Sequence, residues 1–289
     1  MSTPNPIPTA PAVLTKSPIP GPNVMLIGAS GTGKTHSIQT LIECGITPFI
    51  IFTEPGMDIL GDIPVDKLHW HYIRPTSTPW AALEASAKNI NSLSFSALKS
   101  WNDPNKAKYQ TWIDFLKVCN NFVCDRDGKS YGDIATWNTD RAIVVDGLSG
   151  ISRAALKLVV GGHPSPDQGQ WGVAMNAVED IIEKLCLDTQ CMLVIIAHTE
   201  RETSEEEGTS KLMASTLGRK LSPKLPRNFS DVIQTLRVGT NWTWSTVEAG
   251  VDTKARNVPW GKDLQPHFHH VIDKWRERGG LILPTTTNP

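Results

Sequence analysis

The pattern G-x-x-x-x-G-K-[ST] at residues 28–35 constrains the fold of this chain more than any other feature of its sequence. It directly follows a short apolar run at residues 24–27. After it, residues 34–44 carry apolar side chains at helical spacing. A buried strand, a glycine-rich turn and a helix in this order predict the first unit of an α/β fold.

A turn of this kind cradles phosphate groups, because its backbone N–H groups and the positive end of the following helix dipole point inward. In this pattern the lysine, Lys34, reaches the β- and γ-phosphates, and the hydroxyl of Thr35 ligates Mg²⁺. The sequence therefore predicts a site for ATP and Mg²⁺; the alternative is a glycine-rich turn capped by a lysine. The residues expected to contact the nucleotide are Gly28, Ala29, Ser30, Gly31, Thr32, Gly33, Lys34, Thr35 and His36.

Further apolar runs lie at residues 48–53, 142–145 and 191–197, separated by segments with helical spacing. Strands that are apolar throughout are buried on both faces, so this alternation predicts a three-layer α/β fold with a mainly parallel sheet. Residues 232–238 and 242–248 alternate around a Gly-Thr-Asn turn, which predicts a C-terminal antiparallel hairpin at the sheet edge. Helices are expected at residues 79–99, 105–122, 151–160 and 171–188.

The amino-acid composition limits the classes of protein to which this chain can belong. The chain has 289 residues, 39% of them hydrophobic, which is enough for a real core and excludes disorder throughout. Seven of the first 22 residues are proline, so residues 1–22 are expected to form a flexible, extended arm. We expect the core to span residues 23–262 and a C-terminal helix and tail to span residues 263–289.

Several observations favour the cytoplasm of a bacterium or of a phage-infected host cell, away from membranes. No apolar run is long enough to span a bilayer, and the first residues do not resemble a secretory signal. The five cysteines form no C-x-x-C pair. A net charge of −1 also excludes a uniformly basic surface for nucleic acid.

A carboxylate suited to hold the metal follows the apolar run at residues 142–145. Asp146 emerges at the carboxyl end of this expected strand, where ligands lie in open α/β sheets. It is typical of a Walker B aspartate and is expected to ligate Mg²⁺ together with Thr35. The alternative is a cap on the helix that follows.

With these motifs, residues 22–260 resemble the RecA-like P-loop ATPases, in particular compact phage nucleotide-binding AAA-domain proteins and Sak-type single-strand annealing ATPases. The resemblance implies that Glu54, which ends the strand after the P-loop helix, orients the attacking water. It also implies that His198 contacts the γ-phosphate and moves the loop beyond it. The alternatives are a solvated turn residue for Glu54 and an ordinary surface residue for His198.

The segment after His198 is divided by charge. Residues 200–207 contain five Glu and one Arg, whereas residues 211–227 contain five basic residues and no acid. The resemblance implies that this loop contacts single-stranded DNA, although it has no aromatic residue for base stacking. The alternative is a solvated or partner-docking loop. The candidate phosphate contacts are Lys211, Arg219, Lys220, Lys224 and Arg227.

Lys254 and Arg256 look like the Lys-x-Arg finger that RecA and DnaB-type hexamers insert into a neighbour's nucleotide site. A guanidinium there offsets charge on the transferring phosphoryl group. The resemblance therefore implies a homo-oligomer, either a hexamer-like ring or a filament. The alternative is an exposed basic turn.

Other constellations are weaker. Residues 125–133 depart from a calcium loop, because Lys129 occupies a ligand position and Gly128 comes too early. The histidines at 267–270 lack a cysteine or paired carboxylate at ligand spacing, and helix-start or surface histidines are expected instead. Two pairs of cysteines, Cys119 with Cys124 and Cys186 with Cys191, are expected to be buried thiols. Four of the ten tryptophans fall in the last fifty residues, which favours a subunit interface. They are Trp242, Trp244, Trp260 and Trp275.

Together these features predict an oligomeric ATPase that acts on single-stranded DNA in recombination, annealing or repair. In the catalytic set, Glu54, Lys34 and His198 come from one chain, and Lys254 and Arg256 come from a neighbour. Two alternatives remain: a P-loop kinase of a small metabolite, and a nonhydrolytic binding protein that ATP switches.

Overall fold

The computed structural model describes residues 15–74, 79–100, 110–161, 166–204 and 209–286. The strands are β1 (Asn23–Ile27), β2 (Thr47–Phe52), β3 (His69–Tyr72), β4 (Arg141–Asp146), β5 (Met192–Ala197), β6 (Thr199–Ser204), β7 (Thr209–Ala214), β8 (Asp231–Val238), β9 (Asn241–Ser245) and β10 (Lys254–Ala255). The helices are α1 (Lys34–Ser37), α2 (Thr40–Glu43), α3 (Trp80–Ser92), α4 (Phe95–Ser100), α5 (Gln110–Asn120), α6 (Leu148–Val160), α7 (Gln168–Leu187), α8 (Gly218–Leu221) and α9 (His269–Glu277). Short 3-10 turns lie at Met57–Leu60, Ile134–Thr136 and Leu225–Asn228.

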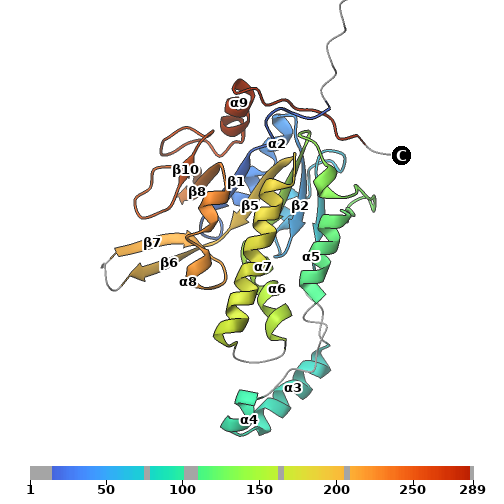
Figure 1. Ribbon diagram of the computed structural model, residues 1–289, viewed down its shortest axis with the longest axis vertical. Coiled ribbons are helices and arrows are strands. Elements are labelled where there is room, and N and C mark those ends of the chain that lie inside the picture. The colour runs from blue at the N-terminus through green and yellow to red at the C-terminus, as the bar shows by residue number, and fades with distance from the viewer. Residues whose placement is uncertain (1–14, 75–78, 101–109, 162–165, 205–208, 287–289) are drawn as a thin grey trace, which may run out of the picture.

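A mainly parallel sheet forms the centre of the molecule, as the sequence predicts (Figure 1). Its parallel strands follow the order β8-β1-β5-β4-β2-β3. The antiparallel strands β9 and β10 both pair with β8, so the predicted C-terminal hairpin is β8–β9. The fold class is therefore confirmed.

The apolar strands are buried on both faces, which explains why they show no alternation in sequence. In β1, Met25 and Ile27 pack in the layer that contains α5, α6 and α7. Val24 and Leu26 pack in the opposite layer, which contains α2 and α9. Water is excluded from both faces, so every position of the strand stabilises the fold when it is apolar.

Local structure differs from the prediction in three places. The polar stretch after His198 forms the antiparallel hairpin β6–β7. Its first strand, with the sequence TERETS, has no apolar alternation that could signal pairing. The helix expected at 79–99 is interrupted at the extended residue Leu93, and that expected at 34–44 is divided into α1 and α2. Of the helix expected at 105–122, residues 105–109 lie outside the described residues.

Both terminal segments pack against the same part of the core. The indole of Trp275 donates to the carbonyl oxygen of Pro20 at 2.8 Å. The backbone N–H of Leu281 donates to the hydroxyl of Ser17 at 3.0 Å. The described part of the proline-rich segment therefore makes specific contacts, while residues 1–14 lie outside the described residues. The domain division stays a prediction.

Among the described helices, none is both long enough and apolar enough to cross a bilayer.

Candidate functional site

The carboxyl ends of the central parallel strands meet at one edge of the sheet, which faces downward in Figure 1. Phe52 lies opposite Asp146, and Ile27 lies opposite Ala197, so the segments that follow these strands begin at the same level. This register brings the P-loop, residues 28–35, together with three side chains that the sequence places at strand ends: Glu54, Asp146 and His198. The three side chains and residues 30–35 of the P-loop line one open cleft, whereas Gly28 and Ala29 are not part of its lining.

The P-loop curls around its own lysine. Gly31 and Gly33 have left-handed backbone angles, with φ of 76° and 81°, which glycine adopts without strain. The Nζ atom of Lys34 donates to the carbonyl oxygens of Gly28 and Ala29 at 2.8 and 2.7 Å. Burial lowers the pKa of Lys34 to about 8, although the charges of two nearby carboxylates oppose this shift. An anionic ligand is therefore the partner that this buried ammonium group lacks.

Asp146 connects the P-loop to β4. The hydroxyl of Thr35 donates to Asp146 Oδ2 at 2.6 Å. Burial raises the pKa of Asp146, so its ionised form needs more positive charge than Lys34 supplies. A hydroxyl and a carboxylate are hard oxygen ligands that Mg²⁺ prefers, and these residues fit that ion. Asp146 does not cap α6, because the N-cap is Gly147 and has no side-chain hydrogen bond.

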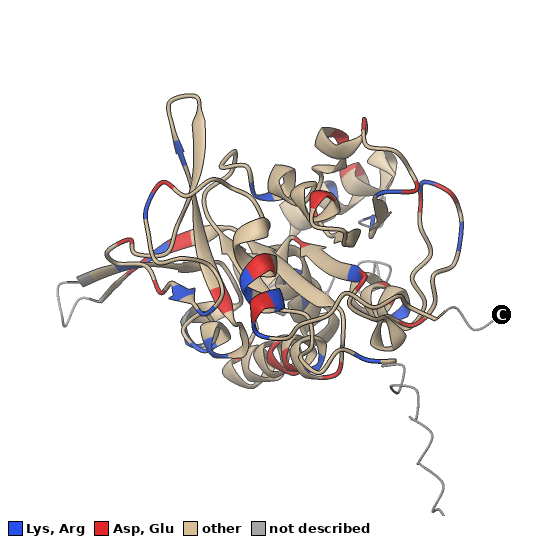
Figure 2. Ribbon diagram, turned by 90° about the horizontal axis from the view of Figure 1, so that it is seen from above, with Lys and Arg blue, Asp and Glu red and all other residues tan. Residues whose placement is uncertain are grey.

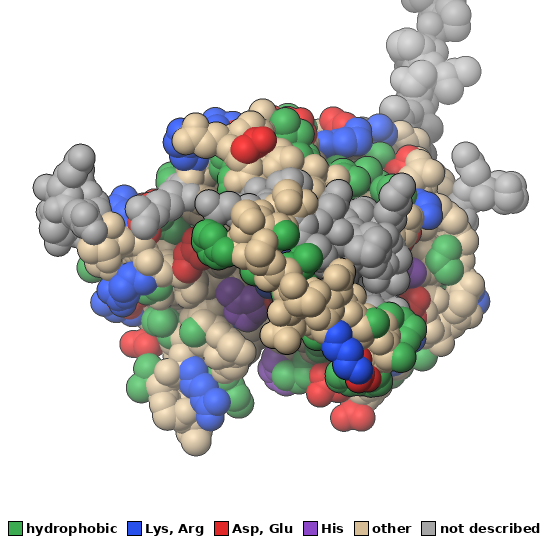
Figure 3. Space-filling model, turned by 90° about the horizontal axis from the view of Figure 1, so that it is seen from below, with side chains coloured by type: hydrophobic (Ala, Val, Ile, Leu, Met, Phe, Trp, Pro, Cys, Tyr) green, Lys and Arg blue, Asp and Glu red, His purple; other side chains and the backbone are tan. Residues whose placement is uncertain are grey.

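Glu54 is held from two sides. Its Oε1 atom accepts a hydrogen bond from the hydroxyl of Ser149. Its Oε2 atom lies 3.3 Å from Nε2 of His198. The carboxylate is fixed at the mouth of the cleft, where a water molecule next to the phosphates would reach it. Seen from below, histidine side chains lie in a hollow of this face (Figure 3).

Three side chains at the site were not predicted from the sequence. Ser149 holds Glu54, as described. The hydroxyl of Thr235, on β8, lies 2.6 Å from that of Thr32. The indole of Trp242, on β9, donates to the carbonyl oxygen of Gly31 at 3.1 Å. No local pattern marks these residues, because Thr235 and Trp242 come from strands distant in sequence and the role of Ser149 depends on its tertiary contact with Glu54.

Lys254 and Arg256 are not brought to this cleft. Ala255 pairs with Asp231, the first residue of β8, so Arg256 lies at the end of the sheet where the parallel strands begin. The Nζ atom of Lys254 donates to the carbonyl oxygens of Pro226 and Arg227, both at 3.3 Å. Burial lowers the pKa of Lys254. Neither side chain can therefore serve the nucleotide site of its own chain.

The buried carboxylate of Asp231 shapes this turn. It accepts hydrogen bonds from the backbone N–H groups of Arg256, Asn257 and Val258. The side-chain amide of Asn257 also donates to it. The side chain of Arg256 is left exposed on a turn of fixed shape.

The basic residues at 211–227 are distributed over several elements rather than one loop. Arg227 pairs with Glu179 at 2.6 Å, and Lys224 pairs with the same carboxylate at 3.1 Å. Lys211 pairs with Asp252 at 3.2 Å, whereas Lys220 is exposed on α8. The side chain of Arg219 lies outside the described part of the structure. Acidic and basic residues are accordingly interspersed over the chain (Figure 2).

The tryptophans of the last fifty residues serve different roles. Trp244 and Trp275 are 0% and 3% exposed within the single chain, so the expectation of a subunit interface is wrong for both. Trp260 is 68% exposed. The cysteines are free thiols, but in the two spaced pairs only Cys124 and Cys191 are buried, whereas Cys119 and Cys186 are partly exposed. Helix α9 begins within the histidine run 267–270, as expected.

Comparison with known proteins agrees with this geometry. A family model described as an AAA domain matches residues 21–263. No curated protein gives a significant match.

Several solved structures are similar to this chain, and three of them serve as examples. One is a prototypical ATPase from the type III secretion system of pathogenic bacteria, with 13% identity over 75% of this chain and 53% of that chain, at a TM-score of 0.38. The assembled ATPase EscN of enteropathogenic E. coli has 12% identity over 75% of this chain and 43% of that chain, at a TM-score of 0.36. The flagellar accessory protein FlaH of Methanocaldococcus jannaschii has 12% identity over 78% of this chain and 77% of that chain, at a TM-score of 0.30. The chain spans about half the length of the secretion ATPases that it matches.

The lowered pKa of Lys34 makes triphosphate binding dependent on pH. Above pH 8 the free protein loses this proton, and a bound phosphate raises the pKa again, so binding must take up protons. We expect uptake to rise from about 0.1 proton at pH 7 to about 0.9 at pH 9. Calorimetry of ATP binding in buffers of different ionisation enthalpy measures this. His36→Gln should leave the rise unchanged, and an uptake independent of pH would contradict the assignment.

Proposed function

This chain belongs to the AAA domain family, and we propose that it binds Mg²⁺–ATP and hydrolyses the terminal phosphoric anhydride. The observation that carries the proposal is the convergence of Lys34, Thr35, Asp146 and Glu54 on one cleft from three strand ends. A phosphate cradle alone supports binding. A carboxylate positioned opposite that cradle supports hydrolysis.

Each group has a separate task. The P-loop N–H groups and Lys34 bind the phosphates, and Thr35 and Asp146 hold Mg²⁺, which offsets charge on the phosphate oxygens. Glu54 accepts a hydrogen bond from the attacking water and orients it. Ser149 and His198 fix the direction of this carboxylate, and His198 is near enough to register a change there. Positioning and charge compensation are the main demands of phosphoryl transfer, and this set contributes to both from within one chain.

Glu54→Gln tests the hydrolytic step. We expect turnover to fall by about 10²- to 10⁴-fold, because an amide cannot accept the water's proton, while ATP affinity stays within a few-fold. Phosphate release and equilibrium ATP binding measure the two effects. Glu84→Gln, on the surface helix α3, is the matched control. Unchanged turnover in Glu54→Gln would favour another base or the nonhydrolytic alternative.

We further propose that the active form is a homo-oligomer in which Arg256 completes a neighbour's site. Support comes from its place at the end of the sheet where the parallel strands begin, away from its own cleft, and from its exposure on a turn held by Asp231. Lys254 holds the preceding strand against residues 226–227 and supports the turn. An arginine supplied in trans accelerates phosphoryl transfer by about 10³- to 10⁵-fold in P-loop enzymes.

Mixing two inactive variants tests this arrangement. Lys34→Ala removes the phosphate contact and Arg256→Ala removes the finger, so each homogeneous preparation should be nearly inactive. A mixed oligomer contains sites that join an intact P-loop to an intact finger. We expect the mixture to recover a measurable fraction of wild-type phosphate release. The Arg256→Ala preparation alone, at the same total concentration, should recover none. Lys262→Ala, elsewhere on the surface, should retain activity, and failure of the mixture at every ratio would contradict action in trans.

Single-stranded DNA is the partner that we propose, in a phage-type ATPase of recombination, annealing or repair in the cytoplasm. Support comes from the base of the β6–β7 hairpin, where the N–H of Ser215 donates to the carbonyl oxygen of His198 at 2.7 Å. A shift of His198 on phosphate loss would therefore move the hairpin and the basic segment that continues from it. Binding would be local, since Glu179 neutralises part of the positive charge.

The ion pairs of Glu179 give this part of the proposal a test with two opposite outcomes. Lys220→Ala should weaken binding of a single-stranded oligonucleotide and lower the salt dependence by about one counterion. Glu179→Gln should strengthen binding, because it releases Lys224 and leaves Arg227 paired with Glu183 alone. Fluorescence anisotropy at several salt concentrations measures both, with Lys67→Ala as the control. If neither variant changes the affinity, this segment does not bind DNA.

A further inference from the structure

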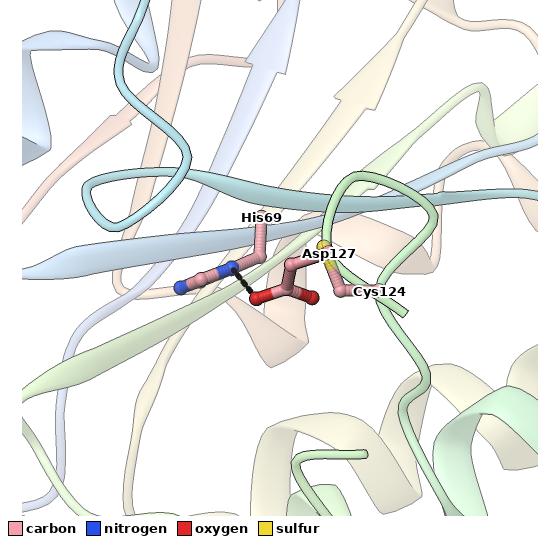
Figure 4. Close-up of side chains that lie close together, drawn as sticks. All are labelled: His69, Cys124 and Asp127. Atoms are coloured by element: carbon pink, nitrogen blue, oxygen red, sulfur yellow. Dashed lines mark ion pairs between the residues drawn. The ribbon is translucent and has the colours of Figure 1, made fainter. Parts of the chain in front are cut away.

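A second group of chemically reactive side chains lies on the edge strand of the sheet, apart from the cleft described above. It comprises His69 on β3 and Cys124 and Asp127 in the turn after α5 (Figure 4). One donor atom of each residue lies within 4.8 Å of the other two. Among the described residues, this is the one set of three or more such side chains with metal-ligating geometry.

We propose that His69, Cys124 and Asp127 bind a zinc ion that fastens the 123–130 turn to β3.

The imidazole of His69 gives the first indication of a missing partner. The residue is 4% exposed, and its Nδ1 atom is buried without a hydrogen-bond partner. Asp127 Oδ2 is 4.0 Å away, which is too far for a hydrogen bond. A buried polar nitrogen left unpaired costs about 1–3 kcal/mol. In Figure 4 the ring nitrogen points toward the carboxylate, with the Cys124 sulfur beside it.

The turn itself is built to present its two ligands on one side. The N–H of Gly128 donates to the carbonyl oxygen of Cys124, and the N–H of Cys124 donates to that of Lys129, each at 2.9 Å. Gly128 has a φ of 69°, which closes the turn. Cys124 and Asp127, three residues apart, therefore face His69 together. The N–H of Asp125 also donates to the carbonyl oxygen of Trp70, which fixes the turn against β3.

The donor set selects the metal. Nitrogen, sulfur and carboxylate oxygen together match zinc, whereas calcium and magnesium take oxygen ligands. Zinc–ligand distances of about 2.0–2.3 Å put tetrahedral donors roughly 3.5 Å apart, so binding draws the three atoms inward by about 1 Å or less. Thiolate and carboxylate together balance the 2+ charge. The carboxylate also accepts hydrogen bonds from Lys129 N–H and the Tyr131 hydroxyl, and these orient it as a ligand.

Three protein ligands leave a fourth position for water. The Asp127 side chain is 14% exposed, so solvent reaches this side of the site, while Cys124 is fully buried. His69 stacks on Phe49 of the neighbouring strand with ring centroids 4.5 Å apart, which keeps the imidazole in place. The buried thiol and the stacked imidazole would hold the ion at one corner of the sheet, between β3 and the turn.

The test begins with the wild-type, full-length protein. Purified without chelator, it should contain about one zinc ion per chain by inductively coupled plasma mass spectrometry. After chelation, addition of Co²⁺ should produce a thiolate charge-transfer band in the near ultraviolet and the visible bands of a tetrahedral site. Neither measurement requires a variant to fold. Absence of both stoichiometric zinc and the cobalt–thiolate band would overturn the proposal.

Variants then locate the ion. Cys124→Ser and His69→Gln should lose the charge-transfer band or weaken zinc binding by more than about tenfold. Cys44→Ser removes an equally buried thiol from the other face of the sheet and should change nothing. Zinc should also raise the thermal midpoint of the wild-type protein and not that of His69→Gln. Zinc that persists in Cys124→Ser comes from other groups, such as the histidines at 267–270, and overturns the assignment.

Discussion

The contact between Thr35 and the half-buried carboxylate of Asp146 is the interaction on which the rest of the site depends. An ionised carboxylate removed from water is costly unless cations or hydrogen bonds compensate it, and burial raises the pKa of this one. The hydroxyl of Thr35 supplies one hydrogen bond, and the Lys34 ammonium supplies charge from nearby. Both residues start α1, so this single requirement fixes where the P-loop lies relative to β4.

The same requirement explains the place of β4 within the sheet. Asp146 is level with Phe52 on one neighbour and Ile196 on the other, so Glu54 and His198 follow within two residues of that level. The lysine meanwhile occupies the loop, donating to its carbonyl oxygens. Phosphate oxygens would compete with those carbonyls for the ammonium group. The site is therefore arranged before any ligand arrives, and binding exchanges hydrogen bonds to neutral carbonyl oxygens for hydrogen bonds to charged phosphate oxygens.

Sequence patterns could predict those parts of the structure that depend on neighbouring residues. The P-loop is a contiguous motif, and Asp146 ends a strand whose burial on both faces makes it apolar throughout. The β6–β7 hairpin was missed because its first strand is polar and shows no alternation, and its second carries apolar residues only at its end. Ser149, Trp242 and the grouping of His69 with Cys124 could not be predicted, because each depends on a tertiary contact between distant segments. Composition suggested an interface for Trp244, whereas burial within the chain accounts for it.

The two sites lie at different heights of adjacent strands, and this separates their physical roles. His69 is paired with Phe49 in the first half of β2, whereas Glu54 follows the last residue of the same strand. A metal at His69 acts on the edge strand and the turn packed against it, and the intervening residues of β2 are buried and closely packed. Such a strand changes shape little when a neighbouring turn loosens, since packed cores deform poorly. Loss of the ion should therefore lower stability more than turnover, whereas the hydrogen bond from Ser215 to His198 connects the nucleotide site directly to the β6–β7 hairpin.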